Sequence, residues 1–187
     1  MFRYALRACA LLAALAVSVD AAEQPAAQSG SIPPKAEMAA AAESLVTEIS
    51  DWLASNFDLP RIEERPAIAF VSRAELENLR MQGGTGHGDN VGAGVDASVV
   101  VAVYHLSKRT IFLSDRWTGK TPADQSVLVH EMVHHLQNLA DMKFECPTAR
   151  EKLAYKAQNR WLGRFGTDLE TEFEIDAFTV LVASACM

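Results

Sequence analysis

One segment of the chain places polar side chains inside what the rest of its pattern marks as a buried helix. Residues Thr121–Asp124 are typical of a helix start, with threonine as the capping residue, proline next and an acid in the first turn. The predicted helix runs to about Ala140. Most of its other residues are apolar, among them Val129, Met132, Val133, Leu136 and Leu139. It also carries His130, Glu131 and His134, and burying such groups is costly unless something pairs with them. The fold must therefore bring a partner to these side chains.

The spacing of the two histidines predicts a metal site. Residues four apart lie on one helix face, so His130 and His134 can bind the same ion. The H-E-x-x-H pattern that they form with Glu131 is typical of zinc hydrolases. Zinc lowers the pKa of its bound water to about 7, and Glu131 would take the proton of that water and pass it to the leaving amine. We therefore predict Zn²⁺ as the cofactor. His135 points about 100° away from His134, and we expect it at the surface or behind the ligands.

A third ligand has to come from further along the chain, because a catalytic zinc takes three protein ligands and keeps one position open. Asp141 is disfavoured, since no glycine turns the chain between it and the motif helix. Glu145 lies in the loop that follows and remains an alternative. Glu151, 17 residues after His134, lies in the first turn of a helix predicted from 148 to about 164. If this helix packs antiparallel to the motif helix, Glu151 reaches the metal, and we predict it as the third ligand.

Glu151 also has a competing interpretation. Together with Thr148 it forms a capping box, in which the glutamate would only satisfy a backbone N–H. Tyr155 and Gln158 follow on the same helix face and extend it as a polar stripe. Tyr155 is predicted to be catalytic by stabilising an oxyanion. An ordinary packed tyrosine is the alternative.

The remaining patterns predict an α+β fold, because helical and strand-like segments follow one another in separate groups along the chain. The motif helix follows a β-hairpin and precedes two further helices. Outside the motif helix we expect helices at 36–56, 72–80, 148–164 and 168–184, and strands at 67–71, 98–104 and 110–113.

Residues 81–94 are predicted to form a glycine-rich loop. The loop lacks the G-K-[ST] ending and the strand-loop-helix setting of a phosphate-binding loop. His87 and Asp89 within it invite a metal interpretation, but glycine runs favour a solvated loop at the border of a cleft.

The N-terminal residues have the order of a secretory signal peptide. A basic start is followed by an apolar run and then by small residues, so we assign residues 1–21 to the signal. Residues 22–35 are predicted to be a flexible lead-in, and residues 36–187 form the domain. We therefore expect a secreted or periplasmic protein. In that oxidising setting Cys146 and Cys186 are expected to form a disulfide, with two buried thiols as the alternative.

Charge and hydropathy limit the partners. The net charge is −7 and no basic patch is visible, which argues against binding to nucleic acid. After the signal, no segment is long and apolar enough to span a membrane.

The residues His130, Glu131, His134 and Glu151, the last followed by A-Y at 154–155, resemble the gluzincin branch of zinc metallopeptidases. The resemblance covers roughly residues 121–162 and is closest to small secreted bacterial proteins. It implies a small zincin-like domain with a short antiparallel or mixed sheet beside the active-site helix. It also implies a metallopeptidase acting on a peptide or protein, with cell-wall peptide among the possible substrates. An edge strand at 111–113 or 99–103 would hold the substrate by strand addition.

A non-catalytic zinc-binding interaction or scaffold protein of the periplasm is the competing hypothesis. An intact Glu131 favours an enzyme, because a structural zinc has no use for an acid between its histidines and usually takes a fourth protein ligand. The oligomeric state is not predicted.

Overall fold

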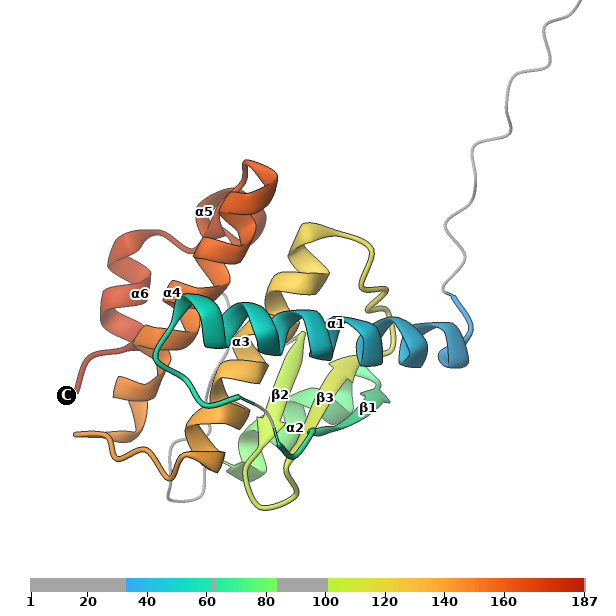
Figure 1. The fold of residues 1–187 in the computed structure, drawn as a ribbon, viewed down its shortest axis with the longest axis horizontal. Coiled ribbons are helices and arrows are strands. Elements are labelled where there is room, and N and C mark those ends of the chain that lie inside the picture. Colours follow the sequence, from blue (N-terminus) through green and yellow to red (C-terminus); the bar gives the residue numbers. More distant parts are fainter. Residues whose placement is uncertain (1–32, 62, 84–100, 187) are drawn as a thin grey trace, which may run out of the picture. The chain divides into compact units, whose positions relative to one another are not determined.

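The computed structural model of the chain describes residues 33–61, 63–83 and 101–186. These residues form an α+β domain, as predicted (Figure 1). The elements in chain order are α1 (Lys35–Asn56), β1 (Ala67–Val71), α2 (Arg73–Gly83), β2 (Ala102–His105), β3 (Thr110–Ser114), α3 (Pro122–Leu139), α4 (Glu151–Leu162), α5 (Leu169–Phe173) and α6 (Ala177–Ala183). The predicted signal peptide, most of the lead-in, and His87 and Asp89 lie outside the described residues.

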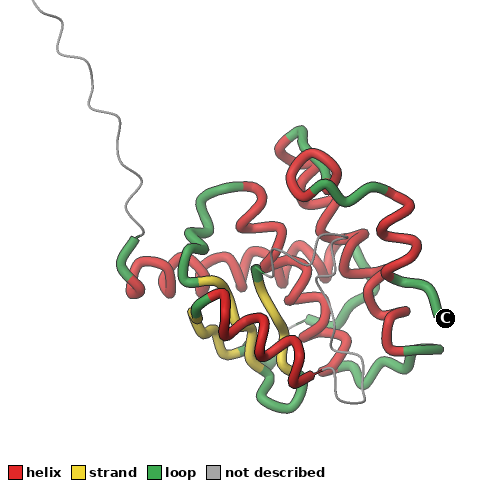
Figure 2. Tube along the Cα trace, turned by 180° about the vertical axis from the view of Figure 1, so that it is seen from behind, coloured by secondary structure: helices red, strands yellow, loops and turns green. Residues whose placement is uncertain are grey.

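The described strands form a mixed sheet in the order β1-β3-β2. β2 and β3 make the predicted antiparallel hairpin, and β1 pairs with β3 in parallel. Side chains alternate between the two faces of the sheet. Val103 and Phe112 pack against Leu76 of α2, which lies across this face (Figure 2). Ile111 and Leu113 point the other way, into the main core.

The main core lies between the sheet, α1 and α3. α1 buries a stripe of residues at helical spacing, namely Met38, Ala42, Val46, Ile49 and Leu53. α3 is buried without a break from Ser126 to Gln137, since α1, β2 and α4 all pack against it. The predicted cap is found, because the Thr121 side chain accepts a hydrogen bond from the backbone N–H of Asp124 at 3.0 Å. The motif therefore lies on the buried and capped central helix.

The C-terminal part differs from the prediction in two places. The helix expected at 148–164 begins later, at Glu151, after a 3-10 turn over Pro147–Arg150. The helix expected at 168–184 is two helices. Glu174 has a φ of 58° and ends α5 in the left-handed region, and the Asp176 side chain then caps α6 by accepting from the backbone N–H of Thr179. Three α-helices rather than two therefore follow α3 in the described chain.

The C-terminal end is tied to the loop between α3 and α4. The predicted disulfide joins Cys146 to Cys186, whose Cα atoms are 5.7 Å apart. Next to it, the Thr148 hydroxyl donates to the backbone oxygen of Ala185 at 2.8 Å.

Over the described residues, none of the helices combines the length and the apolar character needed to cross a membrane.

Candidate metal centre

α3 and α4 run antiparallel, since their polar contacts pair residues in opposite order. His130 Nδ1 lies 2.9 Å from Gln158 Oε1. Two turns further along α3, Gln137 donates its amide to the backbone oxygen of Arg150 at 3.0 Å. This packing puts Glu151, the first residue of α4, opposite both histidines of the motif.

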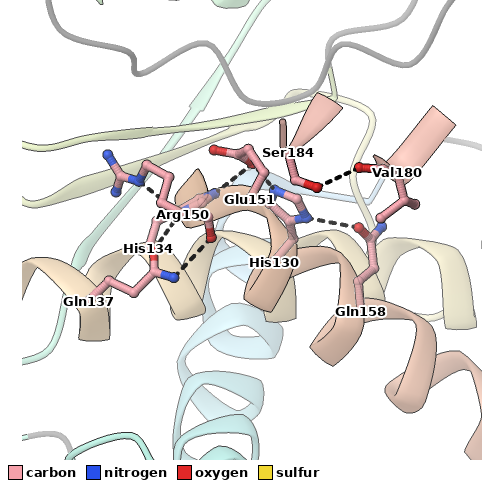
Figure 3. Close-up of polar contacts among 8 residues, drawn as sticks. All are labelled: His130, His134, Gln137, Arg150, Glu151, Gln158, Val180 and Ser184. Atoms are coloured by element: carbon pink, nitrogen blue, oxygen red, sulfur yellow. Dashed lines mark hydrogen bonds and ion pairs between the residues drawn. The ribbon is translucent and has the colours of Figure 1, made fainter. Parts of the chain in front are cut away.

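His130, His134 and Glu151 converge on one point (Figure 3). The Nε2 atoms of both histidines lie 3.4 Å from Oε2 of Glu151. The three residues are buried, and one ligand atom from each lies within 4.8 Å of the others. The structure therefore brings together the three residues predicted as ligands. Asp141 and Glu145 are exposed and lie outside this group.

The converging atoms lack hydrogen-bond partners. Neither His130 Nε2, His134 Nε2 nor either carboxylate oxygen of Glu151 has one within the described chain. Glu151 consequently does not act as a capping residue. Buried polar atoms left unpaired cost about 1–3 kcal/mol each. A cation held by two imidazole nitrogens and a carboxylate would satisfy them together, and zinc accepts this donor set. These residues therefore fit the predicted metal.

The pKa values within the group shift in opposite directions. Burial disfavours the charged form of His130, but the carboxylates of Glu151 and Glu131 outweigh burial and raise its pKa. Burial also disfavours the charged form of Glu151, but the neighbouring His134 and His130 outweigh it and lower the pKa of the carboxyl. The group thus combines an anionic carboxylate with basic nitrogens, an arrangement that attracts a proton or a metal cation.

Glu131 lies between the metal-binding group and strand β2. It is 4% exposed, and its Oε2 has no hydrogen-bond partner in the described part of the chain. Burial raises the pKa of its carboxyl, while the two motif histidines and a backbone hydrogen bond from Tyr104 act in the lowering direction. A raised pKa makes Glu131 a stronger base than an exposed glutamate.

Tyr155 packs on the metal-binding group from α4. Its ring centroid lies 4.9 Å from that of His130 at an interplanar angle of 75°. Burial raises the pKa of its phenol, and the nearby carboxylates of Glu151 and Glu131 raise it further. The hydroxyl therefore stays protonated and can donate a hydrogen bond.

A cavity of about 470 Å³ begins at Tyr155 and extends between α4, α5 and α6. Its walls are partly apolar, at Leu169 and Val180, and partly polar, at Lys156 and Asn159. Tyr155 is the residue that joins this cavity to the metal-binding group, since its ring also contacts His130.

His135 is not at the surface, so that part of the prediction is wrong. It is fully buried, because β2 and the chain before β1 cover this side of α3. Its Nδ1 lies 3.1 Å from the hydroxyl of Tyr104, and its Nε2 lies 2.8 Å from the backbone oxygen of Glu64. It lies outside the metal-binding group, and these contacts join α3 to the sheet.

Three polar residues behind the histidines were not predicted to take part. Gln137 and Arg150 both contact Nδ1 of His134, at 3.0 and 3.2 Å. The Ser126 hydroxyl accepts from the amide of Gln158 at 3.3 Å. Gln137 lies three residues after His134 on one helix face, which is a signal that the sequence does carry. Arg150 and Ser126 have no such signal, because only the packing of α4 on α3 brings them in.

Comparison with known proteins places the chain in a family but gives it no described relative. No curated protein and no solved structure matches it. Residues 38–187, which include every element from β1 to α6 and most of α1, match one family. The chain belongs to that family, which is described as a domain of unknown function (DUF6647).

Proposed function

We propose that the protein is a zinc-dependent hydrolase, and specifically a metallopeptidase of the gluzincin type. The observation that carries this proposal is the convergence of His130 Nε2, His134 Nε2 and the Glu151 carboxylate, all buried and without hydrogen-bond partners in the described chain. A buried carboxylate, Glu131, adjoins them. Three ligands with an acid beside them are what a catalytic zinc needs.

In this proposal the two histidines and Glu151 would hold zinc, a Lewis acid that would lower the pKa of bound water and polarise a carbonyl group. Glu131 accepts a proton from the attacking water on its carboxylate. The water oxygen forms a new bond to the carbonyl carbon. Glu131 then delivers the proton to the amine nitrogen as the C–N bond breaks. The Tyr155 hydroxyl donates a hydrogen bond to the oxyanion that develops on the carbonyl oxygen.

The geometry around the metal-binding group supports an extended substrate, either a peptide or a protein. Cell-wall peptide is one such substrate. β3, which contains Ile111–Leu113, is paired on both sides and has no free edge. β2 has no further strand on its outer side within the described residues. Its residue Tyr104 adjoins Glu131, so we assign strand addition to β2. The cavity beside Tyr155 would take a side chain of the substrate.

We also propose that the protein works in the periplasm or outside the cell. The Cys146–Cys186 disulfide supports this location, because such bonds persist in oxidising compartments.

Two substitutions test the hydrolase. Wild-type protein should bind about one zinc ion per chain and cleave members of a fluorogenic peptide library. Glu131→Gln should keep its zinc and lose about 10²- to 10⁴-fold in rate, since a general acid–base group is removed. Glu151→Ala should lose zinc as well as activity. Elemental analysis and a progress curve measure the two quantities.

Glu145→Ala is the matched control, because Glu145 is an exposed glutamate six residues from Glu151. It should change neither zinc content nor rate. Full zinc binding without cleavage of any peptide by the wild type would favour the scaffold hypothesis. Zinc-free wild-type protein after reconstitution would refute both.

A further inference from the structure

The inference concerns Gln137 and Gln158, and it rests on the proposed zinc site. Each glutamine holds the Nδ1 atom of one motif histidine, at 3.0 Å for His134 and 2.9 Å for His130 (Figure 3). Both amides are buried. An amide has an accepting and a donating end, so its effect on a histidine depends on which end faces the ring.

For Gln137 the orientation is fixed by a backbone carbonyl. The amide nitrogen donates to the backbone oxygen of Arg150 at 3.0 Å, and a carbonyl oxygen can only accept. The amide oxygen of Gln137 is therefore the end that faces His134.

For Gln158 the orientation follows from a serine. The Ser126 hydroxyl donates its single proton to the backbone oxygen of Ala123 at 2.9 Å. It must therefore accept from the amide nitrogen of Gln158, at 3.3 Å. The amide oxygen of Gln158 consequently faces His130.

An amide oxygen accepts, so each histidine must donate from Nδ1. A neutral imidazole with its proton on Nδ1 has its lone pair on Nε2. We infer that Gln137 and Gln158 are positioning residues that select the Nδ1-protonated tautomer of His134 and His130 and so aim both Nε2 lone pairs at the metal. Neither glutamine touches the metal position.

The Nδ1-protonated tautomer is favoured less strongly for His134 than for His130. Nδ1 of His134 also lies 3.2 Å from Nε of Arg150, which can only donate and so favours the opposite tautomer. In that tautomer Nε2 carries the proton and points at Glu151. Gln137 therefore competes with Arg150 for His134, whereas Nδ1 of His130 is contacted by Gln158.

The test is zinc affinity, measured by competition with a chelator on metal-free protein, for wild type, Gln137→Leu and Gln158→Leu. Partners behind metal-binding histidines contribute about 10- to 100-fold in affinity. Both variants should weaken zinc binding by that range, with the larger loss in Gln137→Leu. The absorption bands of bound Co²⁺ should also change, since they report ligand geometry directly.

Two further variants separate positioning from general damage to the fold. Gln125→Leu removes a glutamine of the same helix that donates to the backbone oxygen of Gly119, and should bind zinc as the wild type does. Gln158→Glu keeps an accepting oxygen for His130, and the Ser126 hydroxyl can turn to donate to the other oxygen. This variant should restore zinc affinity to near the wild-type value.

Each outcome is decisive. Equal zinc affinity in Gln137→Leu, Gln158→Leu and wild type would overturn the inference and leave the hydrolase proposal standing. Weak binding in Gln158→Glu as well as Gln158→Leu would also overturn it, since an accepting oxygen would then not suffice. A wild type that binds zinc with the expected variant losses but cleaves no peptide would support the inference and sink the hydrolase. A wild type that binds no zinc would overturn both.

Discussion

The ring of Tyr155 lies edge-to-face against the ring of His130, with centroids 4.9 Å apart. Tyr155 has two separable parts, since its ring packs on a proposed ligand while the pKa of its hydroxyl is raised by burial and by the charges of two carboxylates. Tyr155→Phe keeps the ring and removes only the hydroxyl. We expect unchanged zinc content and a fall in kcat of about 10²- to 10³-fold, which is the usual effect of losing one oxyanion donor.

Tyr155→Ala removes the ring as well. The ring is also part of a small apolar cluster with Leu162 and Leu169, so its loss should destabilise the fold by about 3–5 kcal/mol. Urea unfolding measures this change. A Tyr155→Phe variant that keeps the wild-type rate would remove the hydroxyl from the mechanism and leave a packed tyrosine.

His134 and His135 offer a matched pair of neighbouring histidines, because both are buried and only His134 faces Glu151. His134→Leu should abolish zinc binding. His135→Leu should keep zinc but lose about 1–3 kcal/mol of stability, since the Tyr104 hydroxyl and the Glu64 carbonyl lose their partner. Zinc content and thermal unfolding distinguish the two. Equal zinc loss in both variants would argue against the assignment of His134.

The disulfide closes a loop with a sequence separation of 40 residues. By loop-closure entropy it should stabilise the fold by about 4 kcal/mol. Cys146→Ser combined with Cys186→Ser should therefore lower the Tm by roughly 10 °C. Thiol titration of denatured, unreduced protein checks the bond itself, and two free thiols would show that the cysteines are unpaired.

Asp176 should make α6 sensitive to acid. Its carboxylate accepts hydrogen bonds from the backbone and side chain of Thr179, which lower its pKa below the ordinary value of 3.8. The unfolded chain therefore binds the proton more readily than the folded one. The cap's contribution is complete above pH 3.8 and is lost as the pH falls through the lower folded pKa.

Asp176→Asn tests this because asparagine also caps helices but does not titrate. The variant should lose less stability than the wild type between pH 5 and pH 2, as measured by urea unfolding with the pH as the only variable. An identical pH dependence in both proteins would show that Asp176 does not contribute.

Local patterns determined the elements and most of the candidate site. The motif helix was predicted from Thr121 to about Ala140 and is found at Pro122–Leu139, because capping and apolar spacing are properties of consecutive residues. The hairpin was predicted for the same reason. The break at Glu174 was missed, since nothing in its neighbours requires a left-handed backbone there.

Only the tertiary structure decided which groups meet. Sequence patterns left three acids as candidates for the third ligand, and the antiparallel packing of α4 on α3 brings Glu151 to the histidines while Asp141 and Glu145 stay exposed. The same packing brings Gln158 and Arg150 behind the histidines. His135 is buried instead by β2 and the chain before β1, through Tyr104 and Glu64. A chain's local spacing specifies a helix face within one segment. The residues of a distant segment that contact this helix face are decided by the packing of the whole core. That packing is a property of the fold rather than of any one stretch of residues.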